Sequence, residues 1–252
     1  MKLAGYFVAV VVLLLANRAD ALGTDSNLQD RARAVFESVE KKFENVQTLR
    51  YKAERVSVTR RQTVTEKWSL SLREPNSIRL DYRTPQERLI VADPVSLWEY
   101  APSVRKAHHT DLASVSGQDR SKLLLGVLAR VSIDGIRLGA YQDMVRRATR
   151  VLASTNAANA VRVEGQSPRF SVTIDTNRGV LLETEIYDAK DDLKLRTRAS
   201  DFIEVSPGFR YPQRLEAAYH TTDGLVVSRI TLSDIAVNAP LDDNIFRFVP
   251  PK

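Results

Sequence analysis

Apolar and polar positions alternate with a period of two along residues 68–102, and this alternation predicts short antiparallel strands. The turn sequences Glu74-Pro75, Thr84-Pro85 and Asp93-Pro94 separate the runs, because proline cannot continue a central ladder. We expect the apolar alternates to share one face of a sheet. This set comprises Trp68, Leu70, Leu72, Ile78, Leu80, Tyr82, Leu89, Val91, Trp98 and Tyr100. A face so rich in aromatic residues must be covered by a helix or by a ligand.

The apolar positions before and after this block predict one helix and many more strands. Residues 28–46 repeat apolar side chains at helical spacing and predict an amphipathic helix. The period changes to two from Leu49, and its phase reverses near Glu54-Arg55, which indicates a bend or a β-bulge. Further alternating runs follow in the second half of the chain: 150–154, 160–165, 169–175, 180–187, 193–202, 214–220, 226–237 and a closing strand at Phe246–Val249.

Two helical segments interrupt the strands in the middle of the chain. Residues 121–131 predict a short, very apolar helix that Gly126 weakens, and residues 140–149 have weaker helical character. The overall pattern predicts an α+β protein, mainly antiparallel β, with about eleven strands. Because strands twist, a sheet of that size must curl, and the helical pieces would cover its concave side. We find no repeat and no low-complexity linker, so we expect residues 22–252 to form a single domain.

The first residues are typical of an export signal. Lys2 supplies a positive charge, Tyr6–Leu15 is an apolar run, and Ala19-Asp20-Ala21 offers the small residues that a signal peptidase reads. The run is short for a membrane span, so residues 1–21 are interpreted as a cleavable signal peptide, with an uncleaved anchor as the alternative. The chain has no cysteine, which excludes disulfides, thiol catalysis and thiolate metal sites.

Composition and motifs favour a binding protein over an enzyme. The net charge is +6, and the basic residues are interspersed with acidic ones along the chain. They do not form the basic and aromatic clusters of a nucleic-acid interface. His108 and His109 are adjacent, so on a strand they point to opposite faces and cannot easily bind one metal ion together. The acidic pairs Asp191-Asp192 and Asp242-Asp243 fall in expected turns. Neither a Gly-x-Ser-x-Gly elbow nor a phosphate loop occurs. The sequence therefore predicts no catalytic residues, no metal site and no cofactor.

Two sequence blocks resemble the LolA superfamily, whose members carry lipoproteins across the periplasm. The first block runs from Leu72-Arg73-Glu74-Pro75-Asn76 through Leu97-Trp98 to Tyr100-Ala101-Pro102. The second is the ending Phe246-Arg247-Phe248-Val249-Pro250-Pro251, which is similar to the Phe-x-Phe-x-Pro-Pro ending of the family. The order of elements is similar over nearly the whole chain after residue 21.

The resemblance implies an unclosed, strongly curved β half-barrel with a helical lid over an apolar cavity. The apolar alternates would then line the lipid site, and the inserted helix would supply the lid residues Leu123, Leu124, Val127 and Leu128. The best-known member of the family carries an arginine that contacts its lid where this chain has Glu74, so Arg73 is the candidate for that contact. A family turn of Asp-Gly is here Asp93-Pro94, and proline cannot adopt the positive φ of that glycine.

The function implied is that of a monomeric periplasmic carrier of lipoprotein acyl chains towards the outer membrane. Its expected partners are an inner-membrane transporter that releases the cargo and an outer-membrane acceptor, with no nucleic acid. Two alternatives stay open on the same fold. One is a regulatory module that senses lipoproteins and binds a partner protein, and the other is a carrier of another envelope lipid.

Overall fold

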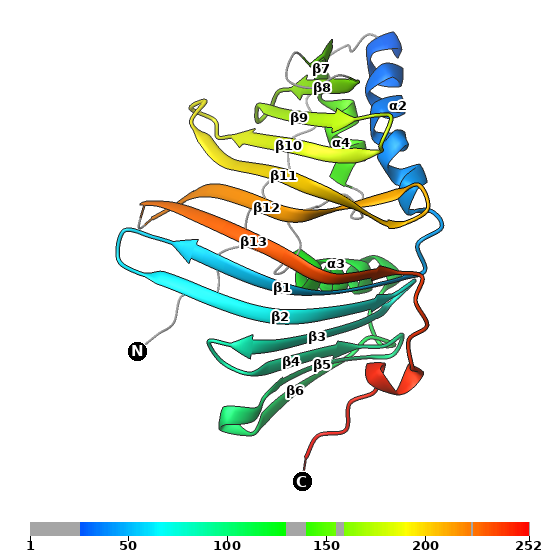
Figure 1. Ribbon diagram of the computed structural model, residues 1–252, viewed down its shortest axis with the longest axis vertical. Helices are drawn as coiled ribbons and strands as arrows, with labels where there is room; N and C mark the ends of the chain where they lie inside the picture. Colours follow the sequence, from blue (N-terminus) through cyan, green and yellow to red (C-terminus); the bar gives the residue numbers. More distant parts are fainter. Residues whose placement is uncertain (1–25, 130–139, 155–158, 223, 252) are drawn as a thin grey trace. The chain divides into compact units, whose positions relative to one another are not determined.

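The computed structural model describes residues 26–129, 140–154, 159–222 and 224–251. Within these residues the chain forms one sheet of thirteen strands, in the order β6-β5-β4-β3-β2-β1-β13-β12-β11-β10-β9-β8-β7 (Figure 1). Neighbouring strands pair antiparallel from β1 to β6 and from β7 to β11, and the terminal strands β6 and β7 each have one neighbour, so the sheet is unclosed. The expected unclosed, mainly antiparallel sheet is confirmed. The expected signal peptide, residues 1–21, lies outside the described residues.

The elements follow the alternation of the sequence closely. The helices are α2 (Ser26–Phe43), α3 (Gly117–Ala129) and α4 (Ala140–Arg146), with short 3-10 helices η1 (Pro102–Val104) and η3 (Asp243–Phe246). The strands are β1 (Thr48–Val58), β2 (Thr63–Arg73), β3 (Ser77–Thr84), β4 (Arg88–Ala92), β5 (Ser96–Ala101), β6 (Lys106–Asp111), β7 (Ala148–Ala153), β8 (Ala160–Gly165), β9 (Phe170–Asp175), β10 (Val180–Tyr187), β11 (Leu193–Ser206), β12 (Phe209–Thr221) and β13 (Gly224–Val237). No helix among the described residues is long and apolar enough to cross a membrane.

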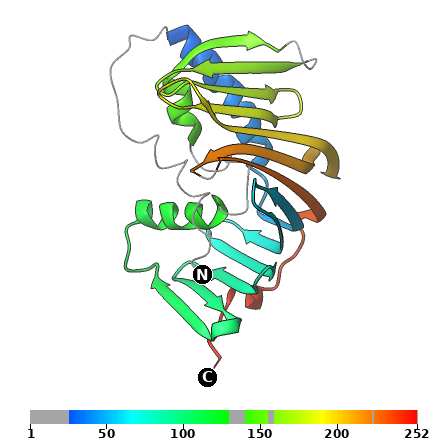
Figure 2. The same ribbon diagram turned by 90° about the vertical axis from the view of Figure 1, so that its left-hand side faces the viewer.

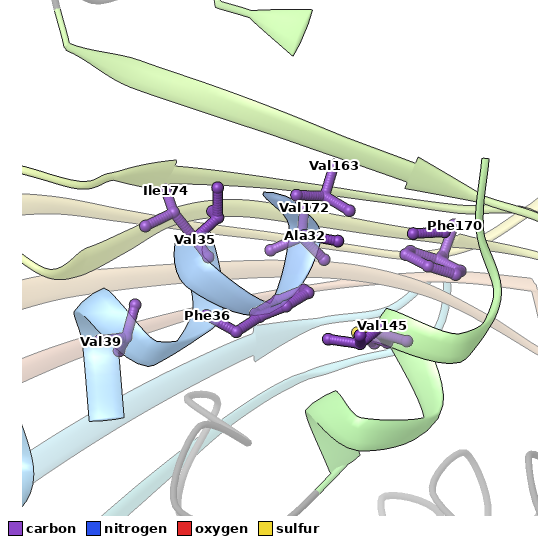
Figure 3. Close-up of a cluster of buried hydrophobic side chains, with 11 residues drawn as sticks. Ala32, Val35, Phe36, Val39, Val145, Val163, Phe170, Val172 and Ile174 are labelled. Atoms are coloured by element: carbon purple, nitrogen blue, oxygen red, sulfur yellow. The ribbon is translucent and has the colours of Figure 1, made fainter. Parts of the chain in front are cut away.

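The described residues within 26–44, 125–200 and 216–227 form one of two compact units. Its core lies where the apolar stripe of α2 packs on β8 and β9, with α4 beside it (Figure 3). Phe36 and Val39 of α2 contribute to this cluster together with Phe170 and Ile174 of β9, all of them buried. The helical spacing predicted for the first helix is confirmed, because the residues at that spacing are the ones that meet the sheet.

The side of these strands away from α2 carries a ladder of charged residues. Glu185 accepts hydrogen bonds from Arg196 Nε, at 2.8 Å, and from Tyr187 Oη, at 3.1 Å, and it also pairs with Arg162. Burial alone would raise the pKa of Glu185, but these hydrogen bonds and the nearby positive charges lower it overall. The carboxylate is therefore held ionised although its side chain is almost fully buried.

The second unit consists of Asn45–Leu124, Asp201–Leu215 and Ser228–Lys252. Strands β1 to β6 follow each other as an antiparallel meander, with a register shift between Lys67 and Trp68 in the pairing of β2 with β3. Figure 2 shows α3 and η3 on opposite sides of β2 and β3. We name the two sides of this meander the α3 side and the η3 side. The residues of α3 up to Leu124 belong to the same unit as the meander.

The structure differs from the sequence expectation at three places. β1 pairs with β2 without interruption through Glu54 and Arg55, so the expected bulge in this pairing is wrong. The expected closing strand at Phe246–Val249 is also wrong, since η3 ends at Phe246 and the following residues are irregular. β6 was not predicted from the sequence, because all but one of its residues are exposed and no apolar alternation marks an edge strand of this kind.

Candidate functional site

The α3 side of the meander is an apolar surface drawn from five consecutive strands. In antiparallel pairs, residues directly opposite each other point to the same side of the sheet. The registers place Leu70 opposite Leu80, and Leu80 opposite Ile90, so these three form one row. The same registers bring together on the α3 side Leu49, Tyr51, Ala53, Trp68, Leu70, Leu72, Ile78, Leu80, Tyr82, Ile90, Ala92 and Leu97. Six of the ten residues predicted for the lipid site are among them.

The other four predicted residues lie on the η3 side, which corrects the expectation of a single shared face. Leu89 is opposite Asp81 and Tyr100, and Val91 is opposite Arg79 and Trp98. Arg79 and Asp81 point away from Leu80, so Leu89, Val91, Trp98 and Tyr100 do too. Consequently the two tryptophans of the chain are on opposite sides, with Trp68 facing the α3 side.

The η3 side is covered by the end of the chain. The ring of Phe248 contacts Trp98 and Tyr100, with centroids 5.6 and 5.3 Å apart. The ring of His109 stacks on that of Trp98, at 4.3 Å between ring centroids. Because Phe248 and its neighbours fill this side, the aromatic residues Trp98 and Tyr100 serve to anchor the C-terminal segment.

Arg73 also belongs to the η3 side, and this corrects its expected contact with a lid. Its guanidinium forms an ion pair with Asp243 and lies over the ring of Phe246, 4.8 Å from the centroid. The hydrogen bond from Arg73 lowers the pKa of Asp243. Arg79 adds a hydrogen bond to the carbonyl of Ile245, at 2.9 Å. Both arginines therefore hold η3 in place.

The four predicted lid residues all lie in α3, with different exposure. Leu124 and Val127 are buried, Leu128 is partly buried, and Leu123 is 38% exposed. The residues 130–131 of the expected helix lie outside the described residues. On the α3 side of the meander, Leu80 and Ile90 have no exposed surface at all. The apolar surface is thus closed in this structure, and a lipid could reach it only if its cover moved.

A charged border, which the sequence did not lead us to expect, limits this apolar surface at one end. Arg55 is opposite Glu66 across β1 and β2, and their side chains form an ion pair of 2.6 Å. Across the meander, Arg88 forms an ion pair with Glu99, also on the α3 side. The sequence did contain a signal for this border: after Ala53 the apolar residues of the alternating pattern shift to the other face of the strand. It marks the point where polar residues replace apolar ones on the α3 side, within an unbroken strand.

The histidines and acidic pairs do not form a polar site among the described residues. His108 is opposite Glu99 and His109 is opposite Trp98, so the two rings leave the strand on opposite sides. Within the described ranges, no group of three or more histidines and carboxylates could hold a metal ion. Asp191 contacts Arg169, and Asp242 caps η3 by accepting a hydrogen bond from the Asn244 N–H.

Comparison with known proteins identifies the family. A family model described as "Outer membrane lipoprotein carrier protein LolA" matches residues 44–196, which is more than half of the chain. The chain belongs to the LolA family. The matched residues include the whole β1–β6 meander, α3 and the charged border. A search of curated proteins found no match.

Solved structures from bacteria share the fold. A LolA superfamily protein from Nitrosomonas europaea has a TM-score of 0.53 at 14% identity, and the alignment covers 86% of this chain and 97% of that one. A lipoprotein-sorting protein domain from Vibrio parahaemolyticus has a TM-score of 0.54 at 15% identity, with coverage of 85% and 97%. At such identities the likeness shows the shared fold alone.

Proposed function

We propose that this chain is a periplasmic carrier that binds the acyl chains of lipoproteins on the α3 side and shuttles them towards the outer membrane. One observation carries the proposal: a LolA-family chain here presents an apolar surface across five strands, with a helix on that side. An inner-membrane transporter that delivers the cargo and an outer-membrane acceptor are the partners that such a role requires.

The physical basis for binding is burial of hydrocarbon. An acyl chain gains on the order of 0.8 kcal/mol for each CH2 group that it buries, and this gain needs no directional contact. The α3 side supplies leucine, isoleucine and aromatic side chains in three adjoining rows. This mode of binding uses neither a catalytic group nor a cofactor.

The closed state of the site makes α3 the proposed lid. Leu124 is buried on a helix whose neighbouring residue Leu123 is exposed, so one face of α3 is covered while the other meets solvent. Gly126 lowers the helix propensity of α3 by about 1 kcal/mol relative to alanine, which makes this helix easier to move or unwind. Displacing α3 would uncover the rows around Leu80 without breaking the pairing of the strands.

The two tryptophans provide a direct test, since they lie on opposite sides of the meander. The variant Trp98→Phe leaves Trp68, on the α3 side, as the single tryptophan, and Trp68→Phe leaves Trp98, on the η3 side. Adding a triacylated peptide should change the emission of Trp68 and saturate at low stoichiometry. The emission of Trp98 should stay constant. A change confined to Trp98 would contradict the proposed site.

The cargo itself can be identified by native mass spectrometry of the protein purified from its own cell envelope. An acylated peptide or lipoprotein bound to the chain is the expected result. A free lipid or glycolipid would instead show a carrier of another envelope lipid. A stable complex with a second protein, in place of transfer to an acceptor membrane, would show a sensing module.

A further inference from the structure

Next to the charged border, the apolar surface of the α3 side contains a buried hydrogen-bond donor without an acceptor among the described residues. Trp68 is 2% exposed, and its Nε1 atom has no hydrogen-bond partner among the described residues. The ring lies between Tyr82, at 6.0 Å between centroids, and the guanidinium of Arg55, 5.3 Å from the ring centroid. Because buried donors are nearly always paired in folded proteins, an unpaired indole N–H at this position calls for an explanation.

The chemistry around Trp68 restricts what could accept this hydrogen bond. The indole nitrogen can only donate, so the partner must be an acceptor. Arg55 is already neutralised by Glu66, and Arg88 by Glu99. A border whose charges are balanced in this way gives no excess attraction to a phosphate or a carboxylate. It suits an uncharged oxygen acceptor on a molecule whose remaining parts are apolar.

Trp68 lies at the end of the apolar rows, and this position indicates how the apolar and polar parts of such a molecule would be oriented. On one side of Trp68 along β2 are Leu70 and Leu72, and on the other side is Glu66. We propose that Trp68 Nε1 donates a hydrogen bond to the ester carbonyl that joins an acyl chain to its glycerol. The chain would then run along the strands towards Leu72 and Ile78, with its linkage at the Arg55 end.

This inference rests on the proposed function and adds to it an orientation and a polar contact. The ester carbonyl is common to lipoproteins and to free glycerolipids. Two probes therefore separate these sources: a diacylglyceryl-cysteine peptide and dipalmitoylglycerol. For each probe the matched control is the ether-linked analogue, which keeps the alkyl chains and lacks the carbonyl.

The first measurement follows the two indole N–H signals of the 15N-labelled protein by NMR, assigned with Trp68→Phe and Trp98→Phe. Saturation with the ester-linked peptide should move the Trp68 indole proton downfield, as expected when a hydrogen bond forms. The ether-linked peptide should bind without that downfield shift. The signal of Trp98, which lies on the η3 side, should not respond to the ester-linked or to the ether-linked peptide. A Trp68 signal that is the same with both linkages would overturn the hydrogen bond.

The second measurement compares affinities in the variants. Trp68→Phe keeps an aromatic ring and removes the donor, so ester-linked peptide should bind about tenfold more weakly, which corresponds to about 1.4 kcal/mol. Binding of the ether-linked peptide should be unchanged, and Trp98→Phe should affect neither. Equal losses for both linkages would show that Trp68 acts only by packing. If the native protein bound neither peptide, the proposed function would fail, and the subsite with it.

Discussion

Truncation of Leu80 to alanine tests whether the α3 side is the lipid site, and its effect on stability can be estimated from the structure. Leu80 has no exposed surface, and it lies between Leu70 and Ile90 on the two neighbouring strands. Leucine-to-alanine changes at such positions cost about 3 kcal/mol, because apolar contacts are lost and a cavity is left behind. With a slope of about 3 kcal/mol per molar urea, the unfolding midpoint should fall by about 1 M.

The matched control is Val91→Ala on the adjacent strand. Val91 is 1% exposed but faces the η3 side, so its truncation should cost about 2 kcal/mol and leave the lipid surface intact. An alkyl chain is flexible enough to fill the space left by the Leu80 side chain. Saturating triacylated peptide should therefore raise the urea midpoint of Leu80→Ala more than that of the native protein. In Val91→Ala the rise should equal the native one.

Urea unfolding followed by far-ultraviolet circular dichroism, with and without the acylated peptide, measures both quantities. A loss below about 1 kcal/mol in Leu80→Ala would refute the packing argument, since a leucine between two buried rows cannot be removed so cheaply. A larger lipid-induced rise in Val91→Ala than in Leu80→Ala would refute the assignment of the lipid site to the α3 side.

Three further predictions concern stability. Gly126→Ala should stabilise the protein by about 0.5–1 kcal/mol in urea unfolding, because an added Cβ meets nothing within 4 Å and alanine favours the helix; a loss of stability would contradict a helical Gly126. Gly165→Ala should destabilise by more than about 2 kcal/mol, because its Cβ would overlap the ring of Phe170 and a backbone oxygen; an unchanged melting temperature would disagree with that packing. The hydrogen bond from Lys194 lowers the pKa of Asp188 to about 2 from its ordinary 3.8. The contribution of the ionised Asp188 to the stability of the folded protein is therefore complete above pH 3.8 and is lost as the pH falls through 2. Asp188→Asn should accordingly flatten the acid limb of a stability–pH curve, and an identical limb would exclude this pair.

The sequence predicted strands and their buried faces well where every second residue is apolar and the residues between are polar. Trp68, Leu70 and Leu72 alternate with polar residues, and the structure places all three on the predicted common side. The same reasoning identified α2, because its apolar stripe has helical spacing and meets β8 and β9.

The sequence could not determine which side the residues of β4 and β5 face. Leu89-Ile90-Val91 is apolar in both phases, so alternation cannot choose between Ile90 and its two neighbours. The turn before β4 sets the register, and this register directs Ile90 to the α3 side. Trp98 is covered by Phe248, which is 150 residues later in the chain, and no local pattern announces a contact of that range.

The place of β13 in the sheet determines the order in which the protein can be completed. β13 is the neighbour of β1, and the Asn238 N–H bonds to the Thr48 carbonyl at 2.9 Å, although about three quarters of the chain lies between them. The β1–β6 meander can pair locally as soon as its own residues are available. The free edge of β1, however, stays unpaired until residues 224–237 arrive, and an open strand edge is where chains aggregate. Pairing over so long a separation is also slow. A holding chaperone that protects this edge should therefore raise the yield of folded protein more than one that acts on the helices.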